Sequence, residues 1–243
     1  GYLTNLEFIF AWRNQLTGEI PPEIGNLTNL MHLEIDRNNF EGNIPSEISN
    51  LTNLRHLELW QNNLSGPILS YLVNLNQLQL LEIDQNNFTG TIPIEINNLT
   101  NLSALWLSSN EFSGEIPLEI GNLPYLTTLA LADNQFSGLI PENICNLNLD
   151  PIWDNSNISQ YMFNNNQFCP PYPDCIQDYT DITEQDVSNC FLCDGSDENE
   201  QVLWGNCYHT EYTTEISLPN SNLTGSIPQE LENFENLDYL NLS

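Results

Sequence analysis

The feature that most constrains this chain is a pattern that recurs with one fixed period through its first half, without a slip. The pattern reads L-x-x-L-x-[LI]-x-x-N-x-[LF]-x-G in the best-matched copies. Copies begin at Leu6, Leu30, Leu54, Leu78, Leu102 and Leu126. A fixed period in the twenties is typical of solenoids, in which each coil buries its apolar side chains against the next coil.

The pattern predicts the local structure of one coil. Its x-L-x-L-x portion alternates with a period of two, which favours a short parallel strand with the leucines inward. The asparagine that follows can bond to backbone groups of adjacent coils, which would otherwise be buried unpaired. The glycine fits a tight bend, and an Ile-Pro pair begins the return side. We therefore predict an α/β solenoid with right-handed curvature and one short parallel strand in each 24-residue coil. The predicted ladder asparagines are Asn38, Asn62, Asn86, Asn110 and Asn134.

The longer pattern N-x-[LF]-x-G-x-I-P-x-x-I-G-N-L resembles the plant-type leucine-rich repeats of receptor ectodomains and polygalacturonase-inhibiting proteins. Similar arrays occur in secreted bacterial and algal proteins. The resemblance covers Gly1 to about Tyr179 and again Thr213 to Ser243. It implies the fold, but it does not identify a ligand, because this fold serves many ligands.

The period predicts three parts of the chain. Residues 1–181 form a repeat block of about seven coils, with a small insertion near 149–157 before the pattern recovers at Ile158. Residues 182–212 fit no repeat and are rich in cysteine and acidic residues, so we expect a junction that resembles a cap. Residues 213–243 begin a second repeat block. Both ends of the chain fall inside a repeat, which suggests a slice of a longer polypeptide.

The charge of the chain narrows its possible partners. It has 33 acidic residues, three arginines and no lysine, for a formal net charge of −30. Such a surface repels phosphate backbones and anionic lipids, so nucleic acid is not expected as a partner. No apolar run reaches the length of a membrane span, so no membrane insertion is expected in this segment. Basic proteins, cations and neutral glycans remain as possible partners.

The six cysteines all lie between Cys145 and Cys207. Clustered cysteines in a lysine-free, Asn-rich chain favour disulfides and an extracellular or cell-surface location. Cys145 and Cys175 occupy return-side positions of adjacent coils, so we expect them to be bonded. The expected pairs are Cys145–Cys175, Cys169–Cys190 and Cys193–Cys207. A local Cys169–Cys175 link across CPPYPDC is the rival for the first pair.

The strand positions that point away from the core carry an unusual set of side chains. All three arginines and two of the three histidines fall there, within the first three coils. Adjacent strands lie about 4.8 Å apart, so Glu34, Glu58 and Glu82 form a carboxylate ladder. These charges could merely neutralise one another, but the aromatic residues among them favour a binding surface. The predicted binding residues are Phe8, Phe10, Trp12, Arg13, His32, Glu34, Asp36, Arg37, Arg55, His56, Glu58, Trp60, Glu82, Asp84 and Trp106.

The sequence predicts no enzyme, cofactor or metal site. His32 has no serine or cysteine nucleophile at hand, and Glu58 and Glu82 would lie on an open sheet without a pocket to raise one pKa. A metal site of the two histidines with Glu34 and Glu58 lacks the closed geometry that metals favour. A calcium loop at Asp194, Asp197, Glu198 and Glu200 is a weak alternative to a solvated acidic loop.

The leading hypothesis is an extracellular recognition or adhesion module that binds a protein or a glycan through the concave strand face. The alternative is a structural subunit or spacer of a surface layer or filament, whose copies associate end to end. Ice binding requires regular threonine rows, and here the Thr28 and Thr52 column is broken by Asn76 and Pro124. Glycosylation depends on the host. The sequons lie at Asn26, Asn50, Asn63, Asn87, Asn98, Asn157 and Asn222.

Overall fold

The computed structural model of the protein describes residues 3–149, 162–170, 172–177, 185–187, 190, 200–203, 206–210, 213, 215–218, 227–234 and 236–242. The chain divides into two compact units, Gly1–Ser188 and Asn189–Ser243. Most of the expected insertion near 149–157 lies outside the described residues. Among the described helices, none has the length and apolar character that a membrane span requires.

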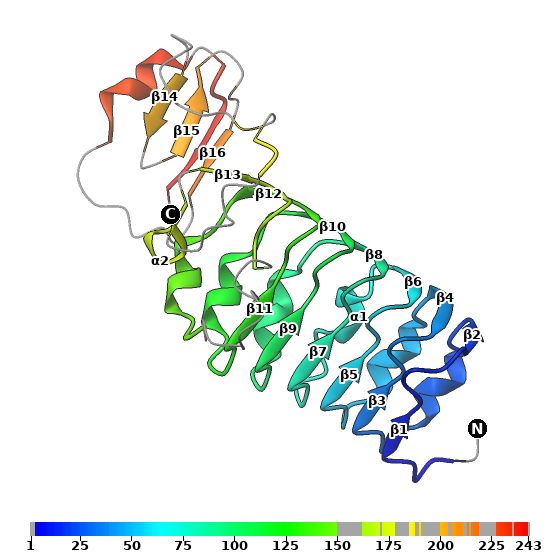
Figure 1. The fold of residues 1–243 in the computed structure, drawn as a ribbon. Coiled ribbons are helices and arrows are strands. Elements are labelled where there is room, and N and C mark those ends of the chain that lie inside the picture. Colours follow the sequence, from blue (N-terminus) through cyan, green and yellow to red (C-terminus); the bar gives the residue numbers. More distant parts are fainter. Residues whose placement is uncertain are drawn as a thin grey trace. The chain divides into compact units, whose positions relative to one another are not determined.

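The first unit is a stack of coils, and each coil contributes one short strand to a parallel sheet (Figure 1). Neighbouring strands pair in register one repeat apart, so that Leu33 lies beside Leu57 and Leu57 beside Leu81. This inward column is buried, as the alternating pattern predicts. The strands of this first sheet are β1 (Phe8–Phe10), β3 (His32–Glu34), β5 (His56–Glu58), β7 (Leu80–Glu82), β9 (Ala104–Trp106) and β11 (Thr128–Ala130).

A second parallel sheet follows the asparagine of each coil, and the sequence pattern did not predict it. It passes through the bend where Gly42, Gly66 and Gly90 have positive φ, a conformation that glycine adopts without strain. The strands are β2 (Thr17–Gly18), β4 (Asn39–Asn43), β6 (Asn63–Gly66), β8 (Asn87–Gly90), β10 (Glu111–Gly114), β12 (Gln135–Leu139) and β13 (Gln167–Cys169).

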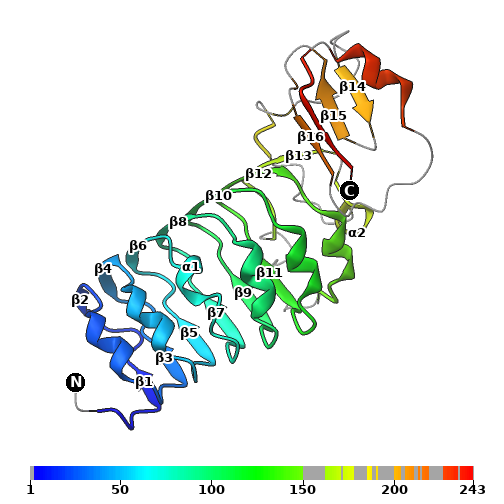
Figure 2. The ribbon, with the colours of Figure 1, turned by 180° about the vertical axis from the view of Figure 1, so that it is seen from behind.

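Short helical turns form the return side of the coils, and Figure 2 shows them in a row along the back of the block. Most follow a proline, whose fixed φ suits the start of a helical turn. At Gly25 a Cβ atom would lie 2.5 Å from the carbonyl oxygen of Glu47 in the next coil, so that these turns pack backbone to backbone. The helices are η1 (Pro22–Asn26), η2 (Ser46–Asn50), α1 (Leu69–Leu72), η3 (Ile94–Asn98), η4 (Leu118–Asn122), η5 (Glu142–Asn146) and α2 (Asp174–Gln177).

One hydrophobic core runs through the coils of the first unit. The position two residues after each ladder asparagine supplies a stack of aromatic rings from Phe88 through Phe112 and Phe136 to Phe168. Successive ring centroids lie 6.2–6.5 Å apart, and all four side chains are fully buried. Each ring therefore packs against its counterparts in the coils before and after it, which stabilises the stacking of coils.

The predicted asparagine ladder is present. Asn62 is representative: its Nδ2 donates to the carbonyl oxygens of Ile35 in the preceding coil, at 3.1 Å, and of Leu59 in its own coil, at 3.0 Å. Its Oδ1 accepts a hydrogen bond from the backbone N–H of Phe40, at 3.0 Å. Equivalent bonds are made at Asn38, Asn86, Asn110, Asn134 and Asn166. One amide thus joins two coils at each step.

The ladder continues one step beyond the last predicted repeat, through Gln185. Its Oε1 accepts a hydrogen bond from the N–H of Phe168 and its Nε2 donates to the carbonyl of Phe163, the two bonds that an asparagine makes elsewhere. Residues 182–212 were expected to fit no repeat, but Gln185 acts as a ladder residue and belongs to the first unit. The sequence pattern misses this position because it follows Asn166 by less than one repeat period and carries a longer side chain.

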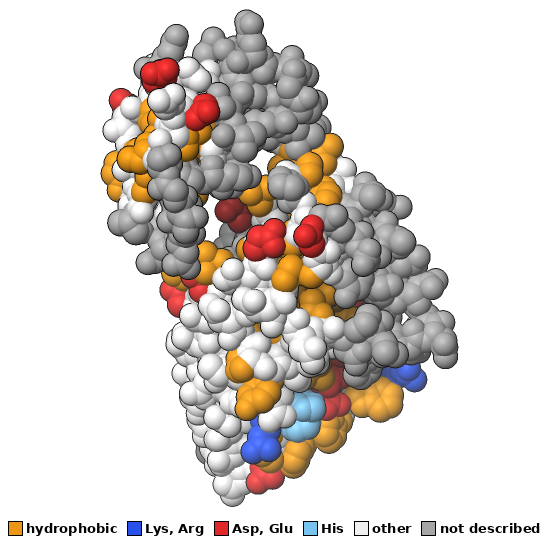
Figure 3. All heavy atoms as spheres, turned by 90° about the vertical axis from the view of Figure 1, so that its left-hand side faces the viewer, with side chains coloured by type: hydrophobic (Ala, Val, Ile, Leu, Met, Phe, Trp, Pro, Cys, Tyr) orange, Lys and Arg blue, Asp and Glu red, His pale blue; other side chains and the backbone are white. Residues whose placement is uncertain are grey.

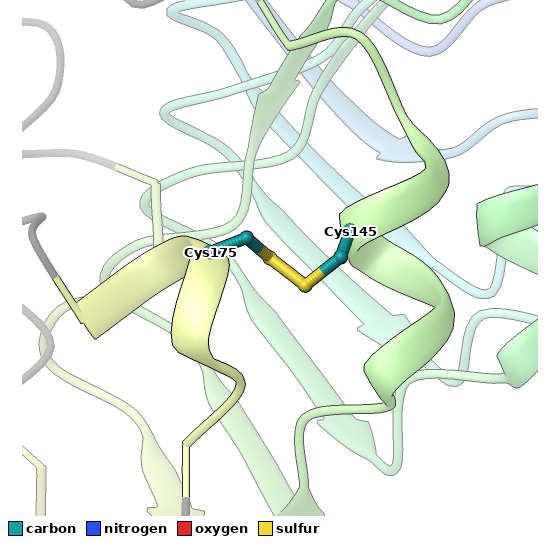
Figure 4. Close-up of a disulfide and its surroundings, with 2 residues drawn as sticks. All are labelled: Cys145 and Cys175. Atoms are coloured by element: carbon teal, nitrogen blue, oxygen red, sulfur yellow. A yellow bond between two sulfur atoms is a disulfide. The ribbon is translucent and has the colours of Figure 1, made fainter.

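A disulfide joins the return sides of two adjacent coils. Cys145 in η5 and Cys175 in α2 are bonded, with their Cα atoms 5.6 Å apart (Figure 4). This is the first of the three expected pairs, and it excludes the local Cys169–Cys175 link. Cys169 and Cys190 are also disulfide-bonded, and their pairing with each other stays a prediction. The third pair depends on Cys193 and on the Cys207 side chain, which lie outside the described part of the structure.

The second unit contains the start of another pair of coils. Ile216 lies beside Leu240 in a parallel pair one repeat period apart, as in the first block. Leu203, Ile216 and Phe234 form its small core. The division into 1–181, 182–212 and 213–243 stays a prediction. The elements are the antiparallel pair β14 (Glu200–Leu203) and β15 (Asn206–His209), the parallel pair β16 (Glu215–Ser217) and β17 (Tyr239–Asn241), and η8 (Gln229–Asn233).

We predict that Asn62→Ala lowers the free energy of unfolding by about 1–3 kcal/mol, because two carbonyls and one N–H group would lose their buried partner. Urea unfolding followed by circular dichroism measures the change. Asn63→Ala is the matched control, since Asn63 is the next residue and is exposed. A change of less than about 0.5 kcal/mol on Asn62→Ala would contradict the ladder assignment.

We predict that non-reducing peptide mapping recovers Cys145 and Cys175 in one cross-linked pair and Cys169 and Cys190 in another. The first pair follows from the observed bond, and the second from the sequence-based pairing. Reduction before digestion is the control and should release all four peptides. Recovery of Cys169 linked to a cysteine other than Cys190 would show that the second pairing is wrong.

Candidate binding face

The candidate site is the outward side of the first sheet in the coils of β1 to β9, here called the strand face. Its side chains alternate with the buried leucines, so the repeat that builds the core also places them in columns. Glu34, Glu58 and Glu82 are direct neighbours in the register and precede Trp106. Figure 3 shows histidine side chains next to acidic and apolar groups on the surface. The predicted binding residues on this face are Phe8, Phe10, Trp12, His32, Glu34, Asp36, His56, Glu58, Trp60, Glu82, Asp84 and Trp106.

The aromatic residues of the strand face differ in exposure. Phe8, Phe10 and Trp12 are exposed, with relative accessibilities of 43%, 57% and 48%. Trp60 and Trp106 are half-buried, although the sequence pattern places them too at positions that point away from the core. Rings that remain accessible on a polar sheet can pack against a ligand.

Two of the arginines lie against tryptophan rings. Arg13 and Arg37 follow the strands with left-handed backbone conformation, at φ of 53° and 52°. The guanidinium of Arg37 lies 4.0 Å from the ring centroid of Trp60 in the next coil, and that of Arg13 lies 5.4 Å from Trp12. Both contacts fall within the range of a cation–π interaction. Arg55 is exposed beside His56.

Histidines rather than arginines form the ion pairs of this face, and the hypothesis that its charges neutralise one another stays an alternative. In the described part of the chain, both ion pairs join a histidine to a glutamate, and neither involves an arginine. Arg37 Nε and Asp84 Oδ1 are buried and have no hydrogen-bond partner. The carboxylates of the strand face therefore form no ion pair with an arginine, although the charge of Arg37 acts on Asp36 and Glu82.

The two histidines of the face lie together. The rings of His32 and His56 stack with centroids 4.1 Å apart. His32 Nδ1 lies 3.3 Å from Glu34 Oε1, and His56 Nδ1 lies 3.8 Å from Glu58 Oε1. The pKa of His56 is lowered, mainly because burial disfavours the charged ring and also because His32 lies close.

Burial and mutual repulsion raise the pKa values of the carboxylates. Burial is the main cause in each case, and neighbouring carboxylates add to it. The pKa of Glu58 rises to about 7, that of Glu82 to about 8 and that of Asp84 to about 6, and the pKa of Asp36 is also raised. The sequence-based argument that an open sheet would not raise such a pKa is therefore wrong. The groups that affect Glu82 are Asp84 on its own coil, Glu58 on the adjacent strand β5, Asp36, and Arg37, which alone opposes the rise.

The residues proposed as calcium ligands lie mostly outside the part of the chain that the structure describes. Asp194, Asp197 and Glu198 lie outside the described residues, as does the side chain of Glu200.

The assignment of the strand face as a binding surface also stays a prediction. The arrangement of rings, carboxylates and unpaired polar atoms suits recognition of a cationic group better than bond-breaking chemistry.

Comparison with known families decides the class of the chain. The model described as Leucine Rich Repeat matches residues 5–27, 29–51, 53–75, 77–99, 101–123 and 125–147, more than half of the sequence. The chain belongs to the leucine-rich repeat family. These matches place one repeat on each coil from β1 to β11, in agreement with the predicted solenoid. A comparison with curated proteins gave no match.

Solved structures identify the type of leucine-rich repeat. The plant peptide hormone receptor RGFR1, in complex with RGF2, is 39% identical with a TM-score of 0.60, over 68% of this chain and 25% of that chain. The Arabidopsis receptor kinase HAESA, in complex with the peptide hormone IDA and the co-receptor SERK1, is 37% identical with a TM-score of 0.65, over 70% and 27%. A TDR receptor is 32% identical with a TM-score of 0.62, over 97% and 34%.

The similarity is to the plant-type repeats of receptor ectodomains, as the sequence pattern predicted. Together with the Cys145–Cys175 disulfide, it identifies an extracellular leucine-rich repeat protein. The family of such ectodomains typically binds ligands without catalysis. The chain spans about a quarter to a third of the length of these receptors, so what they bind is not transferred to it directly.

We predict that the protein becomes more stable as the pH falls from about 8.5 to 5, by about 1–3 kcal/mol from Glu82. The pKa of Glu82 is raised from 4.5 to about 8, so its contribution is present at low pH and is lost as the pH rises through 8. Glu82→Gln should raise the unfolding midpoint at pH 8.5 and flatten the pH dependence. Glu111→Gln, an exposed control in β10, should not. Equal effects of the two variants would contradict the assignment.

Proposed function

We propose that the chain is an extracellular recognition module that binds a basic segment of a protein or peptide partner on the strand face. The observation that carries this proposal is the row of carboxylates in β3, β5 and β7, which forms no ion pair with an arginine. Like charges in register on adjacent strands are destabilising by themselves. A cationic side chain from a partner would remove that repulsion and provide the missing counter-charge.

The aromatic groups support the same use of the face. Phe8, Phe10 and Trp12 offer exposed rings beside the carboxylates, and Arg37 already stacks on Trp60. That contact shows that a guanidinium fits against a ring at this surface. A partner arginine could bind in the same manner, with a ring under its guanidinium and a carboxylate at its edge.

The positions of the sequons also leave this face free. Asn63 and Asn87 begin strands of the second sheet, and Asn26, Asn50 and Asn98 end the helical turns. None of these five lies on an outward position of the first sheet, so any glycan attached to them would leave the strand face open. Asn157 and Asn222 lie outside the described residues.

The similar structures support recognition of a polypeptide rather than a glycan. RGFR1 and HAESA were solved in complex with RGF2 and with a peptide hormone, respectively. Proteins with plant-type repeats of this kind therefore bind peptides, and the part of each that matches this chain is 39% and 37% identical to it, respectively. The basic character of the segment proposed here rests on the carboxylates of this chain alone.

We predict that a hexa-arginine peptide binds at least tenfold more tightly than a hexa-citrulline peptide, by isothermal titration in a buffer with EDTA. The triple variant Trp60→Ala, Glu58→Gln, Glu82→Gln should weaken hexa-arginine binding at least tenfold. Binding should be tighter at pH 8.5 than at pH 6, because only ionised Glu58 and Glu82 attract a guanidinium.

The matched control removes the same two charges and one ring at exposed positions elsewhere, with Tyr125→Ala, Glu95→Gln and Glu111→Gln. It should bind within twofold of the unaltered protein. Equal losses in both variants would show that only the net charge attracts the peptide. Light scattering of the same samples tests the alternative of a structural subunit, which requires self-association.

A further inference from the structure

The sequence HLE occurs in two successive coils, at His32–Glu34 and His56–Glu58, and the structure places the two copies side by side. Within one strand, residues separated by two point to the same side, so each histidine shares the strand face with its own glutamate. The register then sets His32 beside His56 and Glu34 beside Glu58. Two imidazoles and two carboxylates consequently converge on one small area.

From this convergence we infer that His32, His56 and Glu34 form a binding site for one divalent transition-metal ion of the zinc type. One ligand atom from each of these three residues lies within 4.8 Å of the other two. Ligands of a tetrahedral ion bound at about 2.1 Å lie about 3.4 Å apart. His32 Nδ1 and Glu34 Oε1 are 3.3 Å apart, which is the spacing of two ligands of one ion, and the ligand atom of His56 lies within 4.8 Å of both.

The surroundings suit a bound ion. Phe8 packs against His32, with ring centroids 5.1 Å apart, and Phe10 lies at its edge at 6.0 Å. On the other side, Leu80 is the register neighbour of His56. The three ligand residues are half-buried, with apolar side chains beside both histidines.

The charge balance of the face favours a cation here. Glu58 lies 3.8 Å from His56 and can supply a further oxygen ligand or stay as a hydrogen-bond partner of the imidazole. A divalent ion would offset the repulsion within the carboxylate ladder, where the arginines of the described chain make no ion pair. Imidazole nitrogen selects first-row transition metals over Mg²⁺ and Ca²⁺, which prefer ligand sets made only of oxygen.

This inference differs from the sequence-based expectation, in which an open sheet lacked the closed geometry of a metal site. Three protein ligands with remaining positions open is the arrangement of zinc sites that accept a further ligand. The inference does not depend on which partner the strand face recognises.

Isothermal titration of the purified chain with Zn²⁺, after treatment with EDTA and its removal, tests the site. We expect one Zn²⁺ per chain at pH 7.5, and at least tenfold weaker binding in His32→Ala and in His56→Ala. His209→Ala is the matched control, since His209 is the third histidine and lies in β15 of the second unit. It should bind Zn²⁺ within twofold of the unaltered chain.

Two measurements keep the test independent of folding defects in the variants. Circular dichroism checks that each variant folds. On the unaltered protein, Zn²⁺ should protect His32 and His56 from diethyl pyrocarbonate, as mapped by mass spectrometry. The inference is overturned if the unaltered chain does not bind Zn²⁺, if Mg²⁺ binds as tightly, or if neither His32 nor His56 is protected. Unchanged Zn²⁺ affinity in both His32→Ala and His56→Ala would overturn it as well.

Discussion

The hydrogen bonds of the asparagine ladder are the constraint on which the remaining structure depends. Each coil turns sharply after its strand and leaves backbone groups facing the interior, where water cannot satisfy them. A side-chain amide such as Asn62 supplies both a donor and an acceptor and bonds to its own coil and the preceding one. Successive coils are thereby held in one register. Columns of outward side chains can exist only because that register does not drift.

The separation of inward-facing from outward-facing positions explains how the strand face can hold so many carboxylates. The core and the ladder use only the inward positions, so the outward positions are free to vary without loss of the fold. The carboxylates are nevertheless unfavourable in their charged forms, which are poorly solvated and repel each other. The pKa values of Glu58 and Glu82 are raised for this reason. The two proposals made for this face, a basic side chain of a partner and a metal ion, would both supply the cation that such an imbalance favours.

The sequence predicts those parts of the structure that repeat. The period places the strands of the first sheet and the ladder asparagines, because each recurs at equivalent positions of successive coils. It also places Cys145 and Cys175 on the return sides of adjacent coils, where they are bonded. The pattern did not predict Gln185, because its longer side chain reaches the carbonyl of Phe163 from a position less than one repeat period after Asn166. The contact of Arg37 with Trp60 depends on rotamers and a left-handed backbone, which no periodicity encodes.

Glycines and the disulfide occupy one column of the return side. Gly25, Gly121 and Cys145 are equivalent positions, and at both glycines a Cβ atom would collide with the backbone of the next coil. Cys145 bonds to Cys175, the counterpart of Glu47, which Gly25 faces. The column in which two coils pack backbone to backbone at glycine therefore also carries a covalent cross-link at Cys145. The spacing between coils at this column is thus not uniform: a Cβ atom at Gly25 would lie 2.6 Å from that of Glu47, too close for the bond that Cys145 makes.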